Sequence, residues 1–125
     1  MAVKVVDASV VAALVFGEPQ AEEAAALLFD AELVAPALLR YELTNTAWKK
    51  AKRHPAKANL IAAGLKLAGE LDIEYVDVDQ GAVLDLALEE DLTAYDASYL
   101  WLARTIKAPL ASFDARLGRA LPAGR

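Results

Sequence analysis

Four acidic residues stand where carboxylates could take part in catalysis or bind a metal. Asp7 follows the apolar run "VKVV", and Asp114 follows a second one, "APLASF". Asp96 lies in "LTAYDASYL" and Glu42 in "LLRYELTNTAWKK". Sites in open α/β sheets lie beyond the carboxyl ends of parallel strands, so the acids could meet at one sheet edge. Converging aspartates would repel one another, and a hard divalent cation such as Mg²⁺, which prefers oxygen ligands, would neutralise them.

The three aspartates also have a purely structural interpretation. Asp7 and Asp114 stand before helical patterns, where a carboxylate serves as an N-cap by accepting hydrogen bonds from free N–H groups of the first turn. Thr93 and Asp96 have the spacing of a capping box. Any one of these acids alone is better explained as structural, and only their combination favours a site.

Glu42 does not fit the cap interpretation, because it lies inside a helical pattern. Its neighbours one turn earlier are Leu38 and Leu39, and those one turn later are Asn45 and Thr46. A carboxylate bordered by leucines is expected to be partly buried, and a buried carboxylate shifts its pKa or finds a partner. We expect Asn45 to hold Glu42 by a hydrogen bond.

The other polar residues narrow the choice of metal. Ser9 follows Asp7 by two residues and Ser112 precedes Asp114 by two, so each could offer its hydroxyl to a water on the metal. The chain has no cysteine, and its one histidine, His54, stands beside a proline in a basic run and is expected at the surface. These features argue against zinc and against a Ser-His-Asp arrangement.

The elements that would position these residues alternate between strands and helices. Short apolar or β-branched runs predict the strands, and apolar residues at helical spacing predict the helices. Such alternation implies right-handed crossovers and a mostly parallel sheet covered on both faces, so the predicted fold class is α/β, a three-layer α/β/α sandwich. The predicted strands are Lys4–Val6, Leu33–Ala35, Ile73–Val78 and Leu110–Phe113, and the predicted helices are Val10–Phe16, Glu22–Phe29, Ala37–Arg53, Lys57–Leu71, Gln80–Glu90 and Ala94–Ile106, with a short helix after Asp114.

Composition indicates an ordinary globular chain. With 125 residues, of which 57% are hydrophobic, we expect one domain over residues 1–125. The sequence contains no run long and apolar enough for a membrane span and no pattern typical of a signal peptide. The absence of cysteine suits a reducing compartment, so we expect a cytoplasmic location.

Charge is unevenly distributed along this chain, whose formal net charge is −5. The stretch 49–57 is strongly basic, whereas the stretch 67–103 holds no Lys or Arg. Basic residues at the end of a helix are favoured by the helix macrodipole, which is the more common explanation of such a run. The alternative is contact with an anionic partner, such as a nucleic-acid backbone, through Lys49, Lys50, Lys52 and Arg53.

Apolar and aromatic residues outside these motifs are expected to pack in the core. The first predicted helix has almost no polar face, which indicates burial or, alternatively, an exposed groove for a partner helix. Tyr95 and Tyr99 stand close to an acid and could stack a nucleobase, but packing is the better explanation for both. Trp48 and Trp101 are also expected to be packing residues.

Taken in order, these residues resemble the PIN domain family, and in particular the VapC-type ribonuclease toxins of prokaryotic toxin–antitoxin pairs. No single motif is specific, but the likeness runs from "VVDASVVAAL" to "APLASFDARL" and covers nearly the whole chain. The family often has threonine where Ser112 stands, and often a final short strand, for which "LPAGR" is a weak candidate. The ordered set that carries the likeness is Asp7-x-Ser9, Glu42-x-x-Asn45, Asp96 in "TAYDASYL", and Ser112-x-Asp114.

The resemblance implies a Mg²⁺- or Mn²⁺-dependent endoribonuclease that cleaves single-stranded RNA. It also implies a toxin paired with a small antitoxin protein, and a homodimer. Two ions would activate the water and the leaving oxygen, whereas with one ion a free carboxylate such as Asp96 could act as general base. The metal-binding and catalytic residues that it implies are Asp7, Glu42, Asp96 and Asp114, with Ser9, Asn45 and Ser112 as supporting polar residues.

Three other interpretations compete with this one. A non-catalytic α/β interaction module would use the acids only as helix caps and would bind no metal. A phosphoryl-transfer domain would use Asp7 as nucleophile, but such folds favour a second acid close to it and a lysine at a later strand end. A nuclease acting on structured DNA would need extra helices, for which 125 residues leave little room.

Overall fold

Within residues 1–120, the central sheet has four parallel strands in the order β3-β2-β1-β4. The computed structural model describes the backbone of residues 1–120 and the side chains of residues 1–117. β2 pairs with one edge of β1, and β3 pairs with the outer edge of β2. β4, the last strand in the sequence, pairs with the other edge of β1. The strands are β1 (Ala2–Val6), β2 (Ala31–Pro36), β3 (Ile73–Val76) and β4 (Leu110–Ala111).

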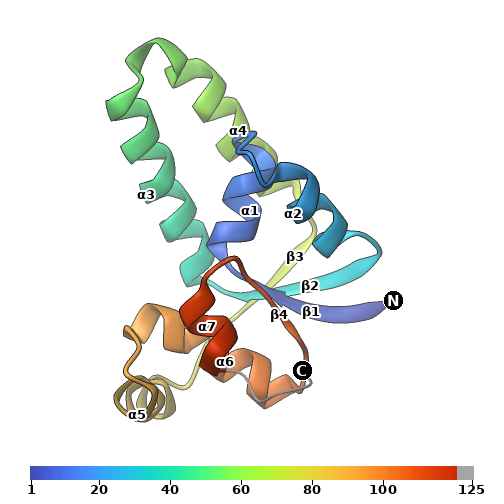
Figure 1. The fold of residues 1–125 in the computed structure, drawn as a ribbon, viewed down its shortest axis with the longest axis vertical. Helices are drawn as coiled ribbons and strands as arrows, with labels where there is room; N and C mark the ends of the chain where they lie inside the picture. Colours follow the sequence, from blue (N-terminus) through green and yellow to red (C-terminus); the bar gives the residue numbers. More distant parts are fainter. Residues whose placement is uncertain (121–125) are drawn as a thin grey trace.

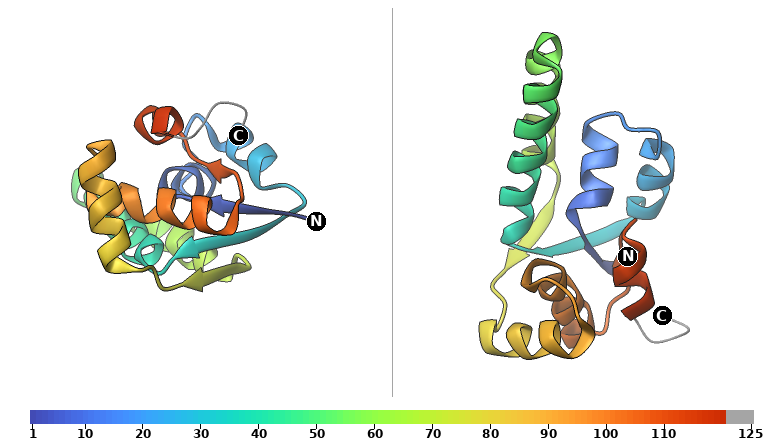
Figure 2. Two further views of the ribbon diagram at one scale, coloured as in Figure 1. Left: turned by 90° about the horizontal axis from the view of Figure 1, so that it is seen from below. Right: turned by 60° about the vertical axis from the view of Figure 1, so that its left-hand side comes forward.

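Helices cover both faces of this sheet, so the molecule has three layers (Figures 1 and 2). The first four helices lie on one side, and the remaining ones lie on the other. The third and fourth, joined by the 3₁₀ turn Pro55–Lys57, form a helical hairpin that extends away from the sheet. The helices are α1 (Ala8–Val15), α2 (Ala21–Leu28), α3 (Leu38–Arg53), α4 (Ala58–Glu70), α5 (Gln80–Glu90), α6 (Ala94–Ile106) and α7 (Ala115–Ala120).

The core joins the sheet to the helices on both faces. Val5 and Val6 of the central strand β1 are fully buried, as are Val10 and Val11 of α1. Tyr99 of α6 belongs to the same core cluster. The predicted burial of the first helix is therefore confirmed. Complete burial of one such side chain stabilises a fold by about 1.5–3 kcal/mol, so Val10 and Val11 anchor α1 to the sheet.

α4 approaches the end of α1 closely at Gly64. A Cβ atom at Gly64 would lie 2.5 Å from the carbonyl oxygen of Val15 and 2.9 Å from Cδ1 of Phe16. Neither distance is compatible with a side chain, so only glycine allows the two helices to pack this tightly. Gly69 lies on the same helix, and a Cβ atom there would meet nothing within 4 Å.

Each strand and helix predicted within residues 1–120 is present, and the main differences are at the strand ends. β3 ends at Val76 instead of Val78, because Val78 packs against α5, whose N-cap is Asp79. β4 ends at Ala111, because the N–H groups that follow donate to serine side chains instead of a neighbouring strand. The predicted final strand "LPAGR" lies outside the described residues. Within those residues, no helix is long and apolar enough to cross a membrane.

Candidate functional site

The strand order creates a topological switch point between β1 and β4. The chain adds β2 and β3 on one side of β1 and places β4 on the other. Val6 pairs with Ala111, so both strands end at the same edge of the sheet, just before Asp7 and Asp114 respectively. Open α/β sheets bind ligands in the crevice at such a point, beyond the carboxyl ends of the strands.

Asp7 is 5% exposed and is surrounded by hydrogen-bond donors. Its Oδ1 accepts from the N–H groups of Ser9 and Val10 at 3.1 and 3.3 Å, which caps α1, and from the Ser9 hydroxyl at 2.6 Å. Its Oδ2 accepts from the Ser112 hydroxyl at 2.5 Å. The predicted N-cap role of Asp7 is therefore confirmed, and its second oxygen is directed toward the end of β4.

Ser9 and Ser112 join the connection after β1 to the connection after β4. Each hydroxyl donates to Asp7 and also accepts a backbone N–H, that of Phe113 to Ser9 at 3.0 Å and that of Asp114 to Ser112 at 2.9 Å. These bonds hold the Asp7 carboxylate and the backbone that leads to the fourth acid, so both hydroxyls position the acids. Their contact with a water on the metal stays a prediction.

Glu42 enters the site from the start of α3 and meets α6. Its Oε1 accepts a hydrogen bond from the Tyr99 hydroxyl at 2.5 Å. Asn45, the expected partner, is exposed and makes no hydrogen bond to Glu42 within the described part of the chain. The Tyr99 ring packs in the core as predicted, being 1% exposed, but the role of its hydroxyl has no local signal in the sequence.

Asp96 and Asp114 lie near the starts of the last two helices. The N–H of Asp96 donates to the Thr93 hydroxyl at 3.1 Å, which confirms Thr93 as the N-cap of α6. Asp114 accepts from the N–H of Arg116 at 2.8 Å through Oδ1, as expected of a cap for α7. The guanidinium of Arg116 donates to the carbonyl oxygen of Asp91 at 3.3 Å, at the end of α5.

Burial raises the pKa of three of these acids, Asp7, Glu42 and Asp96. For Asp7 this increase is partly opposed by the hydrogen bonds from the two serine hydroxyls and from the backbone. For Glu42 the hydrogen bond from the tyrosine opposes it, while the negative charges of Asp96 and Asp7 raise the pKa further. Asp7 caps α1 and Glu42 lies on α3, so their electrostatic interaction places carboxylates from the start of α1 and from α3 in a common region.

Asp96 extends this interaction to the fourth acid. Burial raises the pKa of Asp96, and so does the negative charge of Asp114, while the positive charge of Arg116 lowers it. The four predicted acids are therefore linked by a series of like-charge interactions that runs from Asp7 through Glu42 and Asp96 to Asp114. A positive ion placed among them would relieve this repulsion.

The side chains that gather here fit a hard divalent cation. They are carboxylates and hydroxyls, joined by one guanidinium, and neither cysteine nor the single histidine is among them. Mg²⁺ prefers such oxygen donors and is usually bound by one or two carboxylates together with water and phosphate oxygens. In the part of the chain with described side chains, no three acidic or histidine residues form a complete metal-binding group. The arrangement thus fits an ion held by one or two carboxylates.

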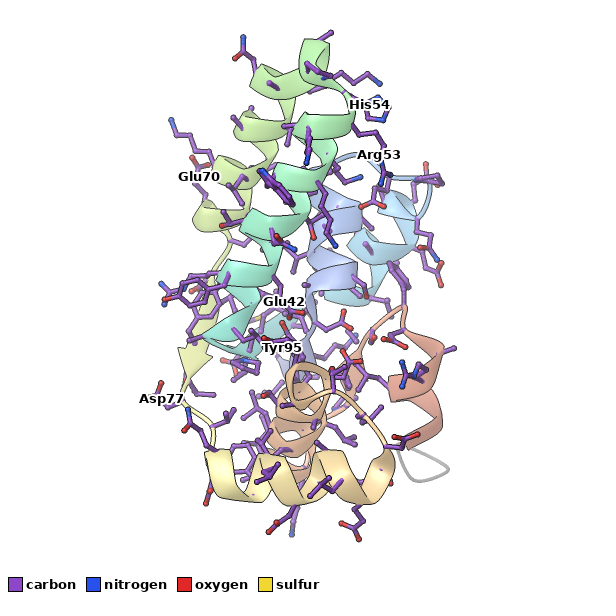
Figure 3. All side chains as sticks on the ribbon, turned by 90° about the vertical axis from the view of Figure 1, so that its left-hand side faces the viewer. Glu42, Arg53, His54, Glu70, Asp77 and Tyr95 are labelled. Carbon is purple, nitrogen blue, oxygen red and sulfur yellow. The ribbon has the colours of Figure 1, made fainter. Side chains whose placement is uncertain are left out.

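Two aromatic side chains that were predicted to pack are exposed. Tyr95, directly before Asp96, is 62% exposed, and Figure 3 shows it with Glu42 where α3 meets α6. Trp48 is 57% exposed, because it stands about 140° around α3 from the buried Leu43. Trp101 packs against the core as predicted. The exposed Tyr95 ring therefore adds an apolar surface beside the acids.

The basic residues of α3 fall on different faces of the helix. Lys50 turns toward the connection between α1 and α2, where it forms an ion pair with Glu18 at 3.5 Å. The ammonium group of Lys52 lies over an exposed tryptophan ring, 5.0 Å from its centre. Lys49 and Arg53 are exposed and form no ion pair with any described residue. The basic residues at the end of α3 are adjacent in the sequence but therefore have different surroundings in the structure.

A cavity of about 750 Å³ lies between the end of α1 and the α3–α4 hairpin. None of the four acids lines it, so it is separate from the candidate site. The first predicted helix was expected either to be buried or to border a groove for a partner helix. Most of α1 is buried, but its C-terminal end borders this cavity. The residues that line it include Leu14, Phe16, Leu60, Ile61 and Leu67, together with His54 and Lys57.

Known proteins resemble this chain over nearly its whole length. The profile of the PIN domain matches residues 4–120, a range that includes all four acids. Ribonuclease VapC3 of Pyrobaculum aerophilum is 34% identical over 125 aligned residues, which cover 95% of each chain. The crystal structure of PAE2754 from the same organism matches the fold with a TM-score of 0.74 at 25% identity, over 93% of this chain and 82% of that one.

Proposed function

Because the chain belongs to the PIN domain family, we propose that it is a Mg²⁺- or Mn²⁺-dependent endoribonuclease that cleaves single-stranded RNA. The name of its relative, Ribonuclease VapC3, supports ribonuclease activity and a role as the toxin of a toxin–antitoxin pair. The observation that carries the proposal is the position of Glu42. This residue lies inside a helix, yet its carboxylate interacts with Asp7 and Asp96 instead of being directed only to solvent.

Helix capping explains only part of this arrangement. Asp7 and Asp114 do accept hydrogen bonds from the first turns of α1 and α7. Capping does not require the caps of different helices to gather at one sheet edge, nor a further acid from inside α3. Because gathered like charges destabilise a fold, a module that only bound other proteins would gain nothing from them. The arrangement therefore favours a nuclease over a non-catalytic module.

The proposed reaction is hydrolysis of a phosphodiester bond at the switch point. Asp7, Glu42, Asp96 and Asp114 would form the ion site, with one or two of them bound directly to the ion. A bound divalent ion lowers the pKa of water and stabilises negative charge on the phosphate. With a single ion, Asp96 would be a carboxylate that is not bound to it, and this carboxylate, whose pKa is raised by burial and by the charge of Asp114, would take the proton of the attacking water.

We also propose a small antitoxin protein as the partner of this chain. The cavity between α1 and the α3–α4 hairpin has the apolar lining that accepts one face of an amphipathic helix. Leu60 and Leu67 line it and are largely exposed. Replacing Leu67 with Glu should abolish co-purification with the cognate antitoxin and leave RNA cleavage unchanged. Co-purification at the wild-type level would contradict this location.

A homodimer is proposed for the same protein. Leu84 and Leu88, one turn apart on α5, are 57% and 75% exposed and form an apolar pair on an outer helix. Exposed apolar surface of this kind is typical of an interface. Leu88→Glu should convert a dimer to a monomer in light scattering. A wild-type chain that is monomeric at high concentration would contradict the dimer.

The activity is tested by incubating the purified chain with mixed single-stranded RNA in Mg²⁺, in Mn²⁺ and in EDTA. Asp7→Asn and Asp96→Asn are assayed beside it, with circular dichroism to confirm that both variants fold. The proposal requires cutting that depends on the metal and is lost in both variants. A folded wild-type chain that neither cuts RNA nor binds Mn²⁺ in calorimetry would show that the acids act as caps alone.

A further inference from the structure

α3 leads from the acidic site to the end of the helical hairpin, and one of its faces is basic. Residues 42, 49 and 53 are separated by about two and three helical turns, so they lie within about 40° of one another around the axis. Glu42 is the residue that α3 contributes to the site. Figure 3 shows Glu42 near the start of α3 and Arg53 near its end, on the same side of the helix. Lys49 and Arg53 therefore continue the line that begins at Glu42.

These two cations differ from the other basic residues of the run. Both are exposed, and neither forms an ion pair with a described residue. Lys50 and Lys52 stand about 80° to either side of the Glu42 line. The first of them is paired with Glu18 and the second lies over a tryptophan ring. Only Lys49 and Arg53 combine a free charge with alignment to the acidic site.

The hairpin concentrates positive charge in an otherwise acidic protein. The whole chain has 13 Lys and Arg against 18 Asp and Glu. A local positive field next to a site that handles a polyanion attracts and retains that polyanion. The basic residues within 38–70 are Arg40, Lys49, Lys50, Lys52, Arg53, Lys57 and Lys66, and the acidic ones are Glu42 and Glu70.

We propose that Lys49 and Arg53 bind phosphates of single-stranded RNA on one side of the bond that is cut, so that the strand follows α3 outward. This inference rests on the proposed function and adds the path of the substrate. With a rise of 1.5 Å per residue, the two residues lie about 10 and 16 Å along α3 from Glu42, which is within reach of neighbouring nucleotides. The helix macrodipole favours cations in the last turn on any face, but Lys49 precedes that turn, and the dipole does not explain alignment with Glu42.

The test compares two double variants that remove the same charge from the same helix. Lys49→Ala/Arg53→Ala removes the aligned pair, and Lys50→Ala/Lys52→Ala is the matched control. Binding of a fluorescent single-stranded RNA is measured with Mn²⁺ in the Asp96→Asn background, where no cutting is expected. The aligned variant should bind about tenfold more weakly, and its salt dependence should fall by about 1.4 in log–log slope, or about 0.7 for each lost phosphate contact. The control should change affinity less than twofold, and Lys49→Arg/Arg53→Lys should restore it.

Cleavage is then measured for the same double variants made without the Asp96→Asn substitution. This assay distinguishes the proposed path along α3 from the proposed nuclease function. The aligned variant should raise KM for RNA and leave kcat unchanged, because the lysine and arginine contact the strand away from the scissile phosphate. Equal weakening by both double variants would mean a general charge effect and would overturn the path along α3. Wild-type affinity in the aligned variant, with an active wild-type enzyme, would overturn the path alone. A wild-type chain that neither binds nor cuts RNA would overturn the proposed function and this inference with it.

Discussion

The Tyr99 hydroxyl donates a hydrogen bond of 2.5 Å to Glu42, although the two residues lie 57 positions apart. The tyrosine is almost fully buried in α6, and Glu42 lies in the second turn of α3, whereas Asp96 lies in the first turn of its helix and Asp7 and Asp114 precede theirs. Burial and the neighbouring negative charges raise the pKa of Tyr99, so its hydroxyl remains a donor at working pH. This bond joins the helix that supplies Asp96 to the helix that supplies Glu42.

Tyr99→Phe should shift the pH dependence of cleavage. The hydrogen bond from Tyr99 lowers the pKa of Glu42, so its loss raises that pKa and leaves more of the carboxylate protonated at a given pH. The acidic limb of the kcat/KM profile should therefore move to higher pH, and stability should fall by about 1–2 kcal/mol. Tyr95→Phe, which removes an exposed hydroxyl, is the control and should keep the wild-type profile. An unshifted limb in Tyr99→Phe would contradict this role for the bond.

The metal-free protein should lose stability as the pH rises from about 4 toward neutrality. The pKa values of Asp7, Glu42 and Asp96 are raised in the folded state, so the folded protein binds these protons more tightly than the unfolded chain does. That contribution is complete below the ordinary carboxyl pKa and is lost as the pH passes through the raised values. Urea unfolding in EDTA at several pH values measures it, and Asp96→Asn should flatten the curve. A free energy of unfolding that rises over this interval in EDTA would contradict the sign.

Divalent ions should stabilise the protein more at neutral than at acidic pH. An ion and protons compete for the same carboxylates, and an ion that binds only the folded state raises Tm by an amount that grows with the logarithm of its concentration above Kd. Addition of Mn²⁺ at about one hundred times its Kd should stabilise the fold by about 2.7 kcal/mol at neutral pH. The Asp7→Asn/Asp96→Asn protein should show no such increase. Equal stabilisation of that variant would place the ion elsewhere on the chain.

Gly64→Ala and Gly69→Ala should have opposite effects on stability. At Gly64 the added methyl group would collide with the Val15 carbonyl oxygen, which forces α4 away from α1 and should cost about 1–3 kcal/mol. At Gly69 the methyl group meets open space, and alanine favours the helix by up to about 1 kcal/mol. Thermal unfolding of the two variants compares the same chemical change on one helix. Similar Tm values would contradict the close approach at Gly64.

Tyr95 should contribute to RNA binding through its ring. The side chain is largely exposed beside Asp96, and stacking of one base on an aromatic ring is worth about 1–3 kcal/mol. Tyr95→Ala should therefore weaken RNA binding about tenfold, while Tyr95→Phe keeps the ring and the affinity. Phe29, which is 81% exposed at the end of α2, provides the control, because Phe29→Ala removes an exposed ring away from the acids. Equal losses in the two alanine variants would argue against stacking at Tyr95.

Local features of the sequence were sufficient to predict the elements and the caps. Strand and helix periodicities are set by neighbouring residues, so the alternating pattern and the parallel sheet followed from them. The same is true of Asp7 and Thr93, because an N-cap accepts hydrogen bonds from N–H groups only two or three residues ahead. The ends of β3 and β4 were misplaced, since side-chain hydrogen bonds from other segments and packing against α5 decide where those strands stop.

The tertiary structure alone decided which side chains face one another. Asn45 is close to Glu42 in the sequence, but the actual donor is Tyr99, because packing of α6 against α3 brings its hydroxyl there. Helical spacing alone shows that Lys49 and Arg53 lie on the same face of α3 as Glu42. It does not show that this face is directed to the site. The sequence by itself thus determined the acids and the elements that carry them. The order of the strands and the packing of the helices determined their partners, because contacts between distant segments depend on the whole fold.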